Sequence, residues 1–336
     1  MPRLRKEPSD KSKKDRRLSR FLQSPLVTLI FGHLPPSISR LYLGSFGMAY
    51  FLFASDERKT IRQALDFCLK ERLVKKKGGR RYWKRTRKGI FDHYHEKLYL
   101  AFPPYDKVKQ DLEKRANVTG LENLDQALSE GKGTILVTGH YGAVEFIPAI
   151  LSFKGYKVTA MVHCNSKALR RILEERAARL GIKLLDPKSE TVFFSVIQHL
   201  KEGRILLTQC DEISMWHPYQ NRKINFLGLE VGLDRCLDIM ARKSRAPVLF
   251  GLNHRRGQRR YELVIEQPSG HPATRGLDLV SAQCLTLLES YIYMNPPAWY
   301  EWKKLKPFLE QVVFEPSDEN YQRRRLSDQM AFHSAG

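Results

Sequence analysis

The sequence predicts an α/β protein with a mixed, mostly parallel sheet flanked by helices and preceded by a basic helical region. Between residues 134 and 294, short apolar runs alternate with longer amphipathic segments, and glycines separate many of them. Such alternation is typical of parallel strands joined by helices. At 336 residues and 42% hydrophobic content, the chain can also bury a large core. It contains neither a Gly-x-Gly-x-x-Gly motif nor a Walker-type loop, so no nucleotide cofactor is expected.

The expected strands are short apolar runs, and the expected helices have apolar residues at helical spacing. We expect strands at residues 134–138, 156–162, 182–185, 204–208, 224–226, 248–252 and 261–266. We expect helices at residues 143–151, 165–180, 191–200, 231–243 and 277–294, and residues 90–127 are also expected to be helical.

The chain is organised around the stretch from Thr134 to Glu145. Its apolar strand stops at Gly139 and is followed by His140, at the edge of the sheet where ligands bind in open α/β folds. Gly142 gives a tight bend and lets a substrate or backbone approach closely. A neutral imidazole can take a proton from a hydroxyl when a carboxylate fixes its tautomer, so His140 and Glu145 form a candidate pair. The alternative is a strand-end histidine with a solvated glutamate in the first turn of a helix.

Two further polar residues are candidates for the same site. Asp211 follows the apolar run 204–208, so its carboxylate is expected at the same sheet edge as His140. Arg176 lies on the apolar stripe of the helix 165–180, where a guanidinium needs an anion such as Glu145 or Asp211. On local grounds, Asp211 can equally be a loop residue and Arg176 a surface residue. No set of His, Cys, Asp or Glu has the spacing of a metal site.

The net charge of +22 indicates a polyanionic partner, which can be nucleic acid, anionic lipid or a phosphorylated substrate. Basic blocks occupy residues 1–20 and 75–89, and Tyr82 and Trp83 are interleaved with the second. Cations with interfacial aromatics suit an anionic membrane surface. No zinc finger, RNP-type strand or helix-turn-helix is recognisable, so a membrane is favoured over nucleic acid. The five cysteines are scattered, as expected for reduced thiols.

These features divide the chain into four parts. We expect a basic disordered tail at residues 1–24, a helical membrane-docking region at 25–127, the α/β core at 128–310 and a polar C-terminal tail at 311–336. The docking region begins with two apolar runs that are split by Pro35, Pro36 and Arg40. Neither run reaches the roughly 20 residues that span a bilayer, so two interface-seeking helices and peripheral attachment are expected.

The segment Thr138 to Glu145, TGHYGAVE, is the first of six motifs that occur in a recognisable order. The other five are Arg176 with Leu180 and Gly181, EGRILLTQCDE, Phe226 to Gly228, VGLDRCLDIMARKSRAPVLFG, and Asn295 to Lys303. Together they resemble the bacterial lipid A biosynthesis acyltransferases, which include lauroyl and myristoyl transferases and phosphatidylinositol mannoside acyltransferases. The resemblance covers about residues 40–305. Glu212 stands where the family's Asp-Gln motif has glutamine.

This resemblance implies a glycerolipid acyltransferase-type fold. It also implies transfer of an acyl group from an acyl carrier protein or coenzyme A thioester to a hydroxyl of a lipid such as a lipid A precursor-like glycolipid. His140 would be the general base oriented by Glu145, and a backbone N–H near Gly142 would support the oxyanion. Arg176 would hold an acceptor phosphate or a site carboxylate, and Asp211 would line the polar wall. No cofactor is implied beyond the thioester co-substrate. The implied location is the cytoplasmic face of the bacterial inner membrane, with peripheral or monotopic attachment.

Three alternatives stay open. The acceptor can be another phospholipid or glycolipid, the protein can be a basic membrane- or RNA-binding protein with an inactive site, or it can be a hydrolase. The joint presence of His140, Glu145 and Arg176 disfavours an inactive site. The hydrolase is disfavoured because no Gly-x-Ser-x-Gly elbow occurs and because Cys164 and Cys210 lack a convincing general base.

Overall fold

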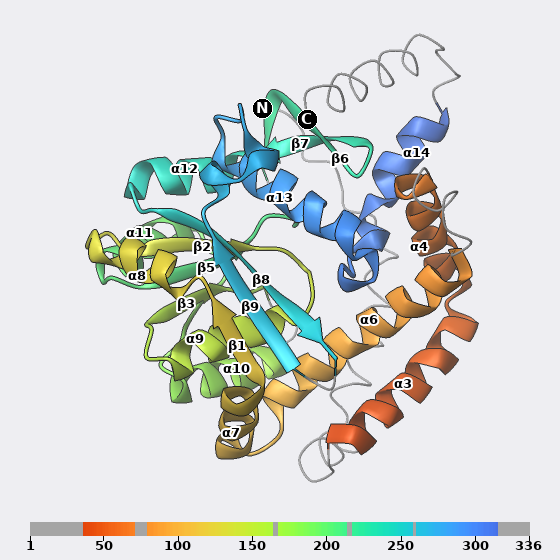
Figure 1. Cartoon of the computed structure of the whole chain (residues 1–336), viewed down its shortest axis with the longest axis horizontal. Coiled ribbons are helices and arrows are strands. Elements are labelled where there is room, and N and C mark those ends of the chain that lie inside the picture. The colour runs from red at the N-terminus through yellow and green to blue at the C-terminus, as the bar shows by residue number, and fades with distance from the viewer. Residues whose placement is uncertain (1–35, 71–78, 164–166, 214–216, 258–259, 315–336) are drawn as a thin grey trace.

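The computed structural model describes residues 36–70, 79–163, 167–213, 217–257 and 260–314. Its centre is a seven-stranded sheet with the order β1-β9-β8-β2-β5-β3-β4, and β6 and β7 form a separate ribbon (Figure 1). The strands are β1 (Ala116–Thr119), β2 (Thr134–Thr138), β3 (Val158–Met161), β4 (Lys183–Leu185), β5 (Ile205–Gln209), β6 (Pro218–Phe226), β7 (Leu229–Asp234), β8 (Val248–Arg256) and β9 (Arg260–Glu266). The α/β fold class expected from the sequence is confirmed.

The five strands from β8 to β4 run parallel, whereas β9 pairs antiparallel with β8 and β1 pairs parallel with β9. All five residues of β2 are buried, and so are four of the five in β5. Strands covered on both faces bury side chains of both directions, so their sequences are continuous apolar runs. This is why the sequence revealed these two strands clearly.

The helices are α3 (Pro36–Phe53), α4 (Ser55–Cys68), α6 (Gly79–Ala101), α7 (Tyr105–Arg115), α8 (Leu121–Ser129), α9 (Ile147–Phe153), α10 (Lys167–Arg179), α11 (Val192–Lys201), α12 (Arg235–Ser244), α13 (Val280–Met294) and α14 (Lys306–Phe314). Short 3-10 turns include Val144–Phe146, Pro296–Ala298 and Trp302–Leu305. Figure 1 shows α3, α4, α6 and α14 along one side of the molecule, with α9 to α12 gathered on the opposite side.

Two expected helical stretches are partly wrong. Residues 116–119 fall within the expected helical stretch 90–127, but they form β1 beside β9, which adds a strand to the sheet ahead of the expected core boundary at residue 128. Residues 231–234 belong to β7, because they pair antiparallel with β6 and alternate between buried and more exposed positions. The helix α12 begins only after Asp234, whose side chain caps it by accepting a hydrogen bond from the Cys236 N–H at 2.9 Å.

The N-terminal helices are fastened to the sheet through α6. The Glu96 carboxylate is fully buried and receives two hydrogen bonds from the Arg255 guanidinium on β8, at 2.7 and 2.8 Å. Gly47 on α3 lies so close to the Phe91 ring on α6 that a Cβ atom there would collide with it. The expected docking region therefore contains helices packed onto the α/β core.

No helix in the described part of the chain is long and apolar enough to cross a membrane. The basic tail at 1–24, the apolar run before Pro35, residues 75–78 of the basic block at 75–89, and residues 315–336 lie outside the described residues. Of the two interface-seeking helices expected from the sequence, the second corresponds to α3.

Candidate active site

The site is built where two neighbouring parallel strands end. Strands β2 and β5 pair up to Thr138 and Gln209, and two residues beyond each of these lie His140 and Asp211. Because the two strands run in the same direction and in register, both side chains emerge at the same sheet edge. The prediction that His140 and Asp211 share one crevice is confirmed, since their side chains are hydrogen-bonded.

The Asp211 carboxylate, which is 0% exposed, is the partner of the His140 imidazole. One of its oxygens lies 2.8 Å from His140 Nδ1. The other oxygen accepts from the His140 backbone N–H at 2.8 Å and from Trp299 Nε1 at 2.7 Å. Three donors satisfy this buried charge, and the Nδ1 contact places a proton on that nitrogen. The arrangement leaves Nε2 as the atom that exchanges protons.

A second carboxylate lies at Nε2. Glu212 Oε1 is 3.2 Å from this nitrogen, and Glu212 Oε2 accepts from Lys304 Nζ at 2.8 Å. Burial disfavours a charged imidazole, but the carboxylates of Asp211 and Glu212 outweigh it and raise the pKa of His140 to about 10. Burial likewise disfavours the Glu212 carboxylate, yet His140 and Lys304 lower the pKa of Glu212 to about 2. The resting site therefore holds an imidazolium between two carboxylates.

Glu145 lies in the turn after this bend, but it faces α6. Its Oε1 atom is 3.6 Å from His93 Nε2 and 3.6 Å from Lys97 Nζ. The orienting position expected for Glu145, on the second nitrogen of His140, is occupied by Asp211. The five-residue separation carries Glu145 around the turn at Gly142 and toward the helix, so the carboxylate that is nearer in sequence is not the one on the imidazole.

The rings of His93 and Tyr300 lie between Glu145 and His140. The His93 ring stacks on the Tyr300 ring at 3.9 Å between centroids, and Tyr300 meets His140 edge-on at 5.5 Å. Burial and the nearby Lys97 lower the pKa of His93 well below its usual value, so it is neutral. Among the described residues, neither His93 Nδ1 nor the Tyr300 hydroxyl has a hydrogen-bond partner, although both are buried. Two polar atoms beside His140 thus remain able to bond a ligand.

Gly142 has a structural reason to be glycine. Its φ is 60°, and a Cβ atom there would collide with the backbone oxygen of Asn253 on β8. The Gly142 N–H donates to the Ala298 carbonyl at 2.9 Å, and the Ala143 N–H donates to the Asn253 carbonyl at 2.8 Å. Both of these N–H groups are therefore already used within the protein, and the expected oxyanion donor near Gly142 stays a prediction.

Arg176 is not joined to the site carboxylates. It lies on α10 with a half-buried side chain, and burial together with the nearby Arg179 lowers its pKa. No hydrogen bond or ion pair links its guanidinium to a carboxylate within the part of the chain that the structure describes. The expected pairing with Glu145 or Asp211 is absent, which leaves a ligand anion as the remaining expected partner.

Four residues of this site were not identified from the sequence, namely His93, Trp299, Tyr300 and Lys304. Trp299 and Tyr300 fall in the terminal motif Asn295 to Lys303, which signalled their region but not their contacts. His93 and Lys304 lie in ordinary helical and basic surroundings, and no local pattern distinguishes them. In the described residues, no group of His, Cys, Asp and Glu is arranged to hold a metal ion.

A histidine held by a buried carboxylate, at the ends of adjacent parallel strands, defines an α/β protein with an acid–base site at the sheet edge. The sequence model of the bacterial lipid A biosynthesis acyltransferases matches residues 10–305, and the chain belongs to this family. The resemblance drawn from the sequence motifs is thereby confirmed. Membership implies an acyltransferase that uses an acyl donor and a lipid acceptor. A comparison with curated proteins found no match for the chain.

Proposed function

We propose that the protein is a membrane-associated O-acyltransferase. It moves a fatty acyl group from an acyl carrier protein or coenzyme A thioester to a hydroxyl of a lipid A precursor-like glycolipid. Family membership supports the reaction class. The observation that carries the proposal is the fully buried Asp211 carboxylate, hydrogen-bonded at 2.8 Å to Nδ1 of His140. A histidine held in this way can activate a hydroxyl once Nε2 is free of its proton.

The proposed transfer is a direct attack. Neutral His140 takes the proton of the acceptor hydroxyl at Nε2 while the hydroxyl oxygen bonds to the thioester carbonyl carbon. The carbon–sulfur bond of the tetrahedral intermediate then breaks, and the departing thiolate takes the proton from Nε2. Asp211 keeps the imidazole in its orientation and stabilises the imidazolium between these two steps. A thioester is reactive enough that no covalent acyl-enzyme is needed.

The oxyanion needs a donor, and the backbone N–H groups of residues 140–143 already donate to protein oxygens. Side chains are the remaining source. The Tyr300 hydroxyl is buried, lies on a ring that contacts His140 edge-on, and has no hydrogen-bond partner among the described residues. We assign it as the candidate donor to the oxyanion. Burial raises the pKa of Tyr300 well above its usual value, so the hydroxyl keeps its proton at neutral pH.

Arg176 is the candidate for an anionic group of the acceptor. Its half-buried guanidinium has no carboxylate partner within the described residues, and the nearby Arg179 lowers its pKa further, so an added anion would relieve both burial and repulsion. A planar guanidinium binds a phosphate with two parallel hydrogen bonds. A phosphorylated glycolipid meets both requirements, because it carries hydroxyls and phosphate groups on one molecule.

The lipid surface is expected to dock against α3. Ile38, Leu41, Met48 and Leu52 are spaced three, seven and four residues apart, which places them on one helix face, and they are 47%, 72%, 53% and 66% exposed. The opposite face includes the buried Leu43 and packs on α6, where Gly47 lies against the Phe91 ring. A helix that is apolar on both faces needs a second apolar partner.

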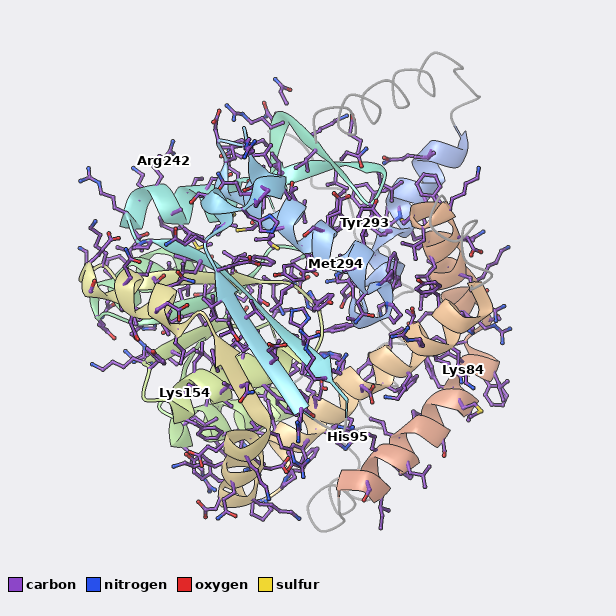
Figure 2. The ribbon with its side chains drawn as sticks, viewed as in Figure 1. Lys84, His95, Lys154, Arg242, Tyr293 and Met294 are labelled. Carbon is purple, nitrogen blue, oxygen red and sulfur yellow. The ribbon has the colours of Figure 1, made fainter. Side chains whose placement is uncertain are left out.

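Exposed cations lie on the neighbouring helix α6, including Lys84, labelled in Figure 2, and Lys88. Together with the net charge of +22, they favour a bilayer with anionic headgroups over an uncharged one. We assign the attachment to the cytoplasmic face of the bacterial inner membrane, because the acyl thioester donors are in the cytoplasm.

Hydrolysis through a cysteine nucleophile receives no support from the described thiols. Cys210 and Cys284 are both buried, and burial raises the pKa of each thiol above its usual value. A raised pKa keeps the sulfur protonated and unreactive. Cys164, which the sequence analysis considered together with Cys210, lies outside the described residues.

The direct test is turnover with purified protein, an acyl thioester and a glycolipid extract, followed by mass spectrometry of the lipid. We expect an acceptor whose mass rises by one acyl group, together with one free thiol per acyl group transferred. Thiol release without any acylated lipid would instead indicate a hydrolase. Absence of thiol release, with retained binding to lipid or RNA, would indicate an inactive binding protein.

A further inference from the structure

The atom that must receive the acceptor proton is already occupied. Each nitrogen of an imidazole ring makes one in-plane hydrogen bond, and Asp211 uses the bond at Nδ1. Glu212 Oε1 lies 3.2 Å from Nε2, which is hydrogen-bond distance for a ring nitrogen. An acceptor hydroxyl has to lie at this same distance and in this same direction to lose its proton. The Glu212 carboxylate and the acceptor hydroxyl therefore exclude each other.

Lys304 determines where the Glu212 carboxylate lies. Its Nζ atom binds the other Glu212 oxygen at 2.8 Å and is 3.5 Å from Glu301 Oε2. The Lys304 side chain is only 16% exposed. Glu212 and Glu301 raise the pKa of Lys304 although burial acts in the opposite direction, so the lysine remains charged. A buried ammonium with two carboxylates can keep Glu301 while Glu212 moves away.

We propose that Glu212 is a placeholder for the acceptor hydroxyl, held on Nε2 of His140 with the help of Lys304 and displaced when the acceptor binds. This inference rests on the proposed role of His140 as the base. On displacement, the Nε2–H bond breaks and the proton passes to the Glu212 carboxylate and then to water. Nε2 is left with the lone pair that takes the proton of the acceptor hydroxyl. The free protein thus keeps its base protonated, which protects a bound thioester from attack by water in the absence of acceptor.

The charged and titratable groups that face the imidazole come from three parts of the chain. The segment after β5 supplies Asp211 and Glu212, and the segment after α13 supplies Tyr300, Glu301 and Lys304. The helix α6 supplies His93. Glu145, in the 3-10 turn Val144–Phe146, lies beyond His93. Of these, Asp211 and Glu212 contact the ring nitrogens directly. Removing one of the two carboxylates should therefore have a specific effect on the protonation of His140.

The test combines two variants that act in opposite directions. In protein with isotope-labelled histidine, the NMR titration of His140 is assigned from the signal that is lost in His140→Ala. Glu212→Gln removes a negative charge from Nε2, so we expect the His140 midpoint to fall by about one pH unit or more. Lys304→Met removes the competing cation, so we expect the midpoint to rise. General damage to the site would move both midpoints in the same direction.

The matched control is Glu202→Gln, which alters a solvent-facing carboxylate paired with Lys183. This change should leave the His140 midpoint unchanged.

Kinetics then tests the competition with the acceptor. In Glu212→Gln the acceptor has no carboxylate to displace, so its KM should fall about tenfold near neutral pH, and the acid limb of kcat/KM should move to lower pH. An unchanged His140 midpoint, or an acceptor KM that stays the same or rises, would overturn the placeholder role. Failure of the proposed function gives a different result. The unmodified protein would then form no acylated lipid, or His140→Ala would retain full transfer, while the NMR midpoints of Glu212→Gln and Lys304→Met still shifted.

Discussion

At the residue scale, the chemistry depends on the two hydrogen bonds that Asp211 makes to His140. One fixes the ring through Nδ1 and the other fixes the backbone N–H, so the side chain and the main chain of one residue are held by one buried carboxylate. Trp299 adds a third bond at 2.7 Å. The imidazole therefore has little freedom to turn, and its Nε2 atom points to a defined place.

We expect His140→Ala to lose about 10²–10⁴-fold in kcat/KM, the usual effect of removing a positioned base. Asp211→Asn should lose a similar factor, because an amide can donate to Nδ1 and so stabilise the wrong tautomer. Steady-state rates measure both effects, and thermal unfolding shows whether the folded state is kept. The control is Asp125→Asn, which alters a solvent-facing carboxylate bonded to Tyr156 and should keep full activity. Near-normal turnover in either site variant would contradict the assignment of the base.

Arg176→Lys tests the acceptor anion. Lysine keeps the charge but lacks the two-pronged geometry that binds a phosphate. We expect the KM for a phosphorylated acceptor to rise about tenfold, as for the loss of one charge-assisted hydrogen bond, with the free energy of unfolding unchanged. The matched control is Arg179→Lys, an exposed arginine one turn along the same helix. Equal effects of the two changes, or equal effects on phosphorylated and dephosphorylated acceptors, would remove Arg176 from the site.

At the element scale, the ion pair between Glu96 and Arg255 joins α6 to the carboxyl end of β8. The Glu96 carboxylate is 0% exposed and both of its oxygens are bonded by the guanidinium, at 2.7 and 2.8 Å. Burial of Glu96 is costly by itself and raises its pKa, so the pair depends on its geometry. His93 and Lys97 lie on the same helix as Glu96. The ion pair between Glu96 and Arg255 therefore also positions these two side chains of the site.

Glu96→Ala leaves the Arg255 charge buried without its partner, and we expect the free energy of unfolding to fall by about 3–5 kcal/mol. Denaturant titration measures this change. Glu174→Ala removes an exposed partner of Arg170 and should change stability by less than about 1 kcal/mol. The double variant Glu96→Met with Arg255→Met should recover part of the loss, since it removes both charges together. A loss no larger than that of the exposed control would show that α6 is held by its apolar contacts alone.

At the scale of the whole molecule, the exposed apolar face of α3 and the excess of positive charge favour the same partner. Apolar side chains gain free energy by entering the bilayer interface, while each Lys or Arg near an anionic surface contributes about 1 kcal/mol. The electrostatic part weakens with added salt because the Debye length shortens. Attachment that combines both contributions is expected to be strong at low salt and weaker, but not abolished, at high salt.

We expect the full-length protein to sediment with vesicles that contain phosphatidylglycerol more strongly than with phosphatidylcholine vesicles, and less as salt increases. Leu41→Asp with Leu52→Asp should reduce binding to both kinds of vesicle, because both residues are removed from the apolar face. Phe194→Asp is the matched control, since Phe194 is 73% exposed but lies on α11, on the other side of the molecule (Figure 1). Binding that resists both the α3 changes and high salt would place the attachment elsewhere in the chain.

Much of this architecture could be predicted from the sequence, because it depends on local patterns. The buried strands β2 and β5 are continuous apolar runs, and parallel strands end at one edge, so His140 and Asp211 could be assigned to one crevice. The ordered motifs identified the family for the same reason, since each is a short stretch of chain. Residues 231–234 of β7 were mistaken for the start of a helix, because their short alternating pattern runs directly into the helical pattern of α12 and only the pairing with β6 separates the two.

The partners of each site atom were decided only by the tertiary structure. Glu145, five residues from His140, is carried around the bend at Gly142 toward α6, whereas Asp211, 71 residues away, lies on the imidazole. The Glu212 carboxylate, which contacts Nε2, is bonded by Lys304 across 92 residues. Sequence patterns determine which face of an element is buried. A hydrogen bond also requires two side chains from different elements to meet at about 3 Å, and only the packing of those elements sets that distance.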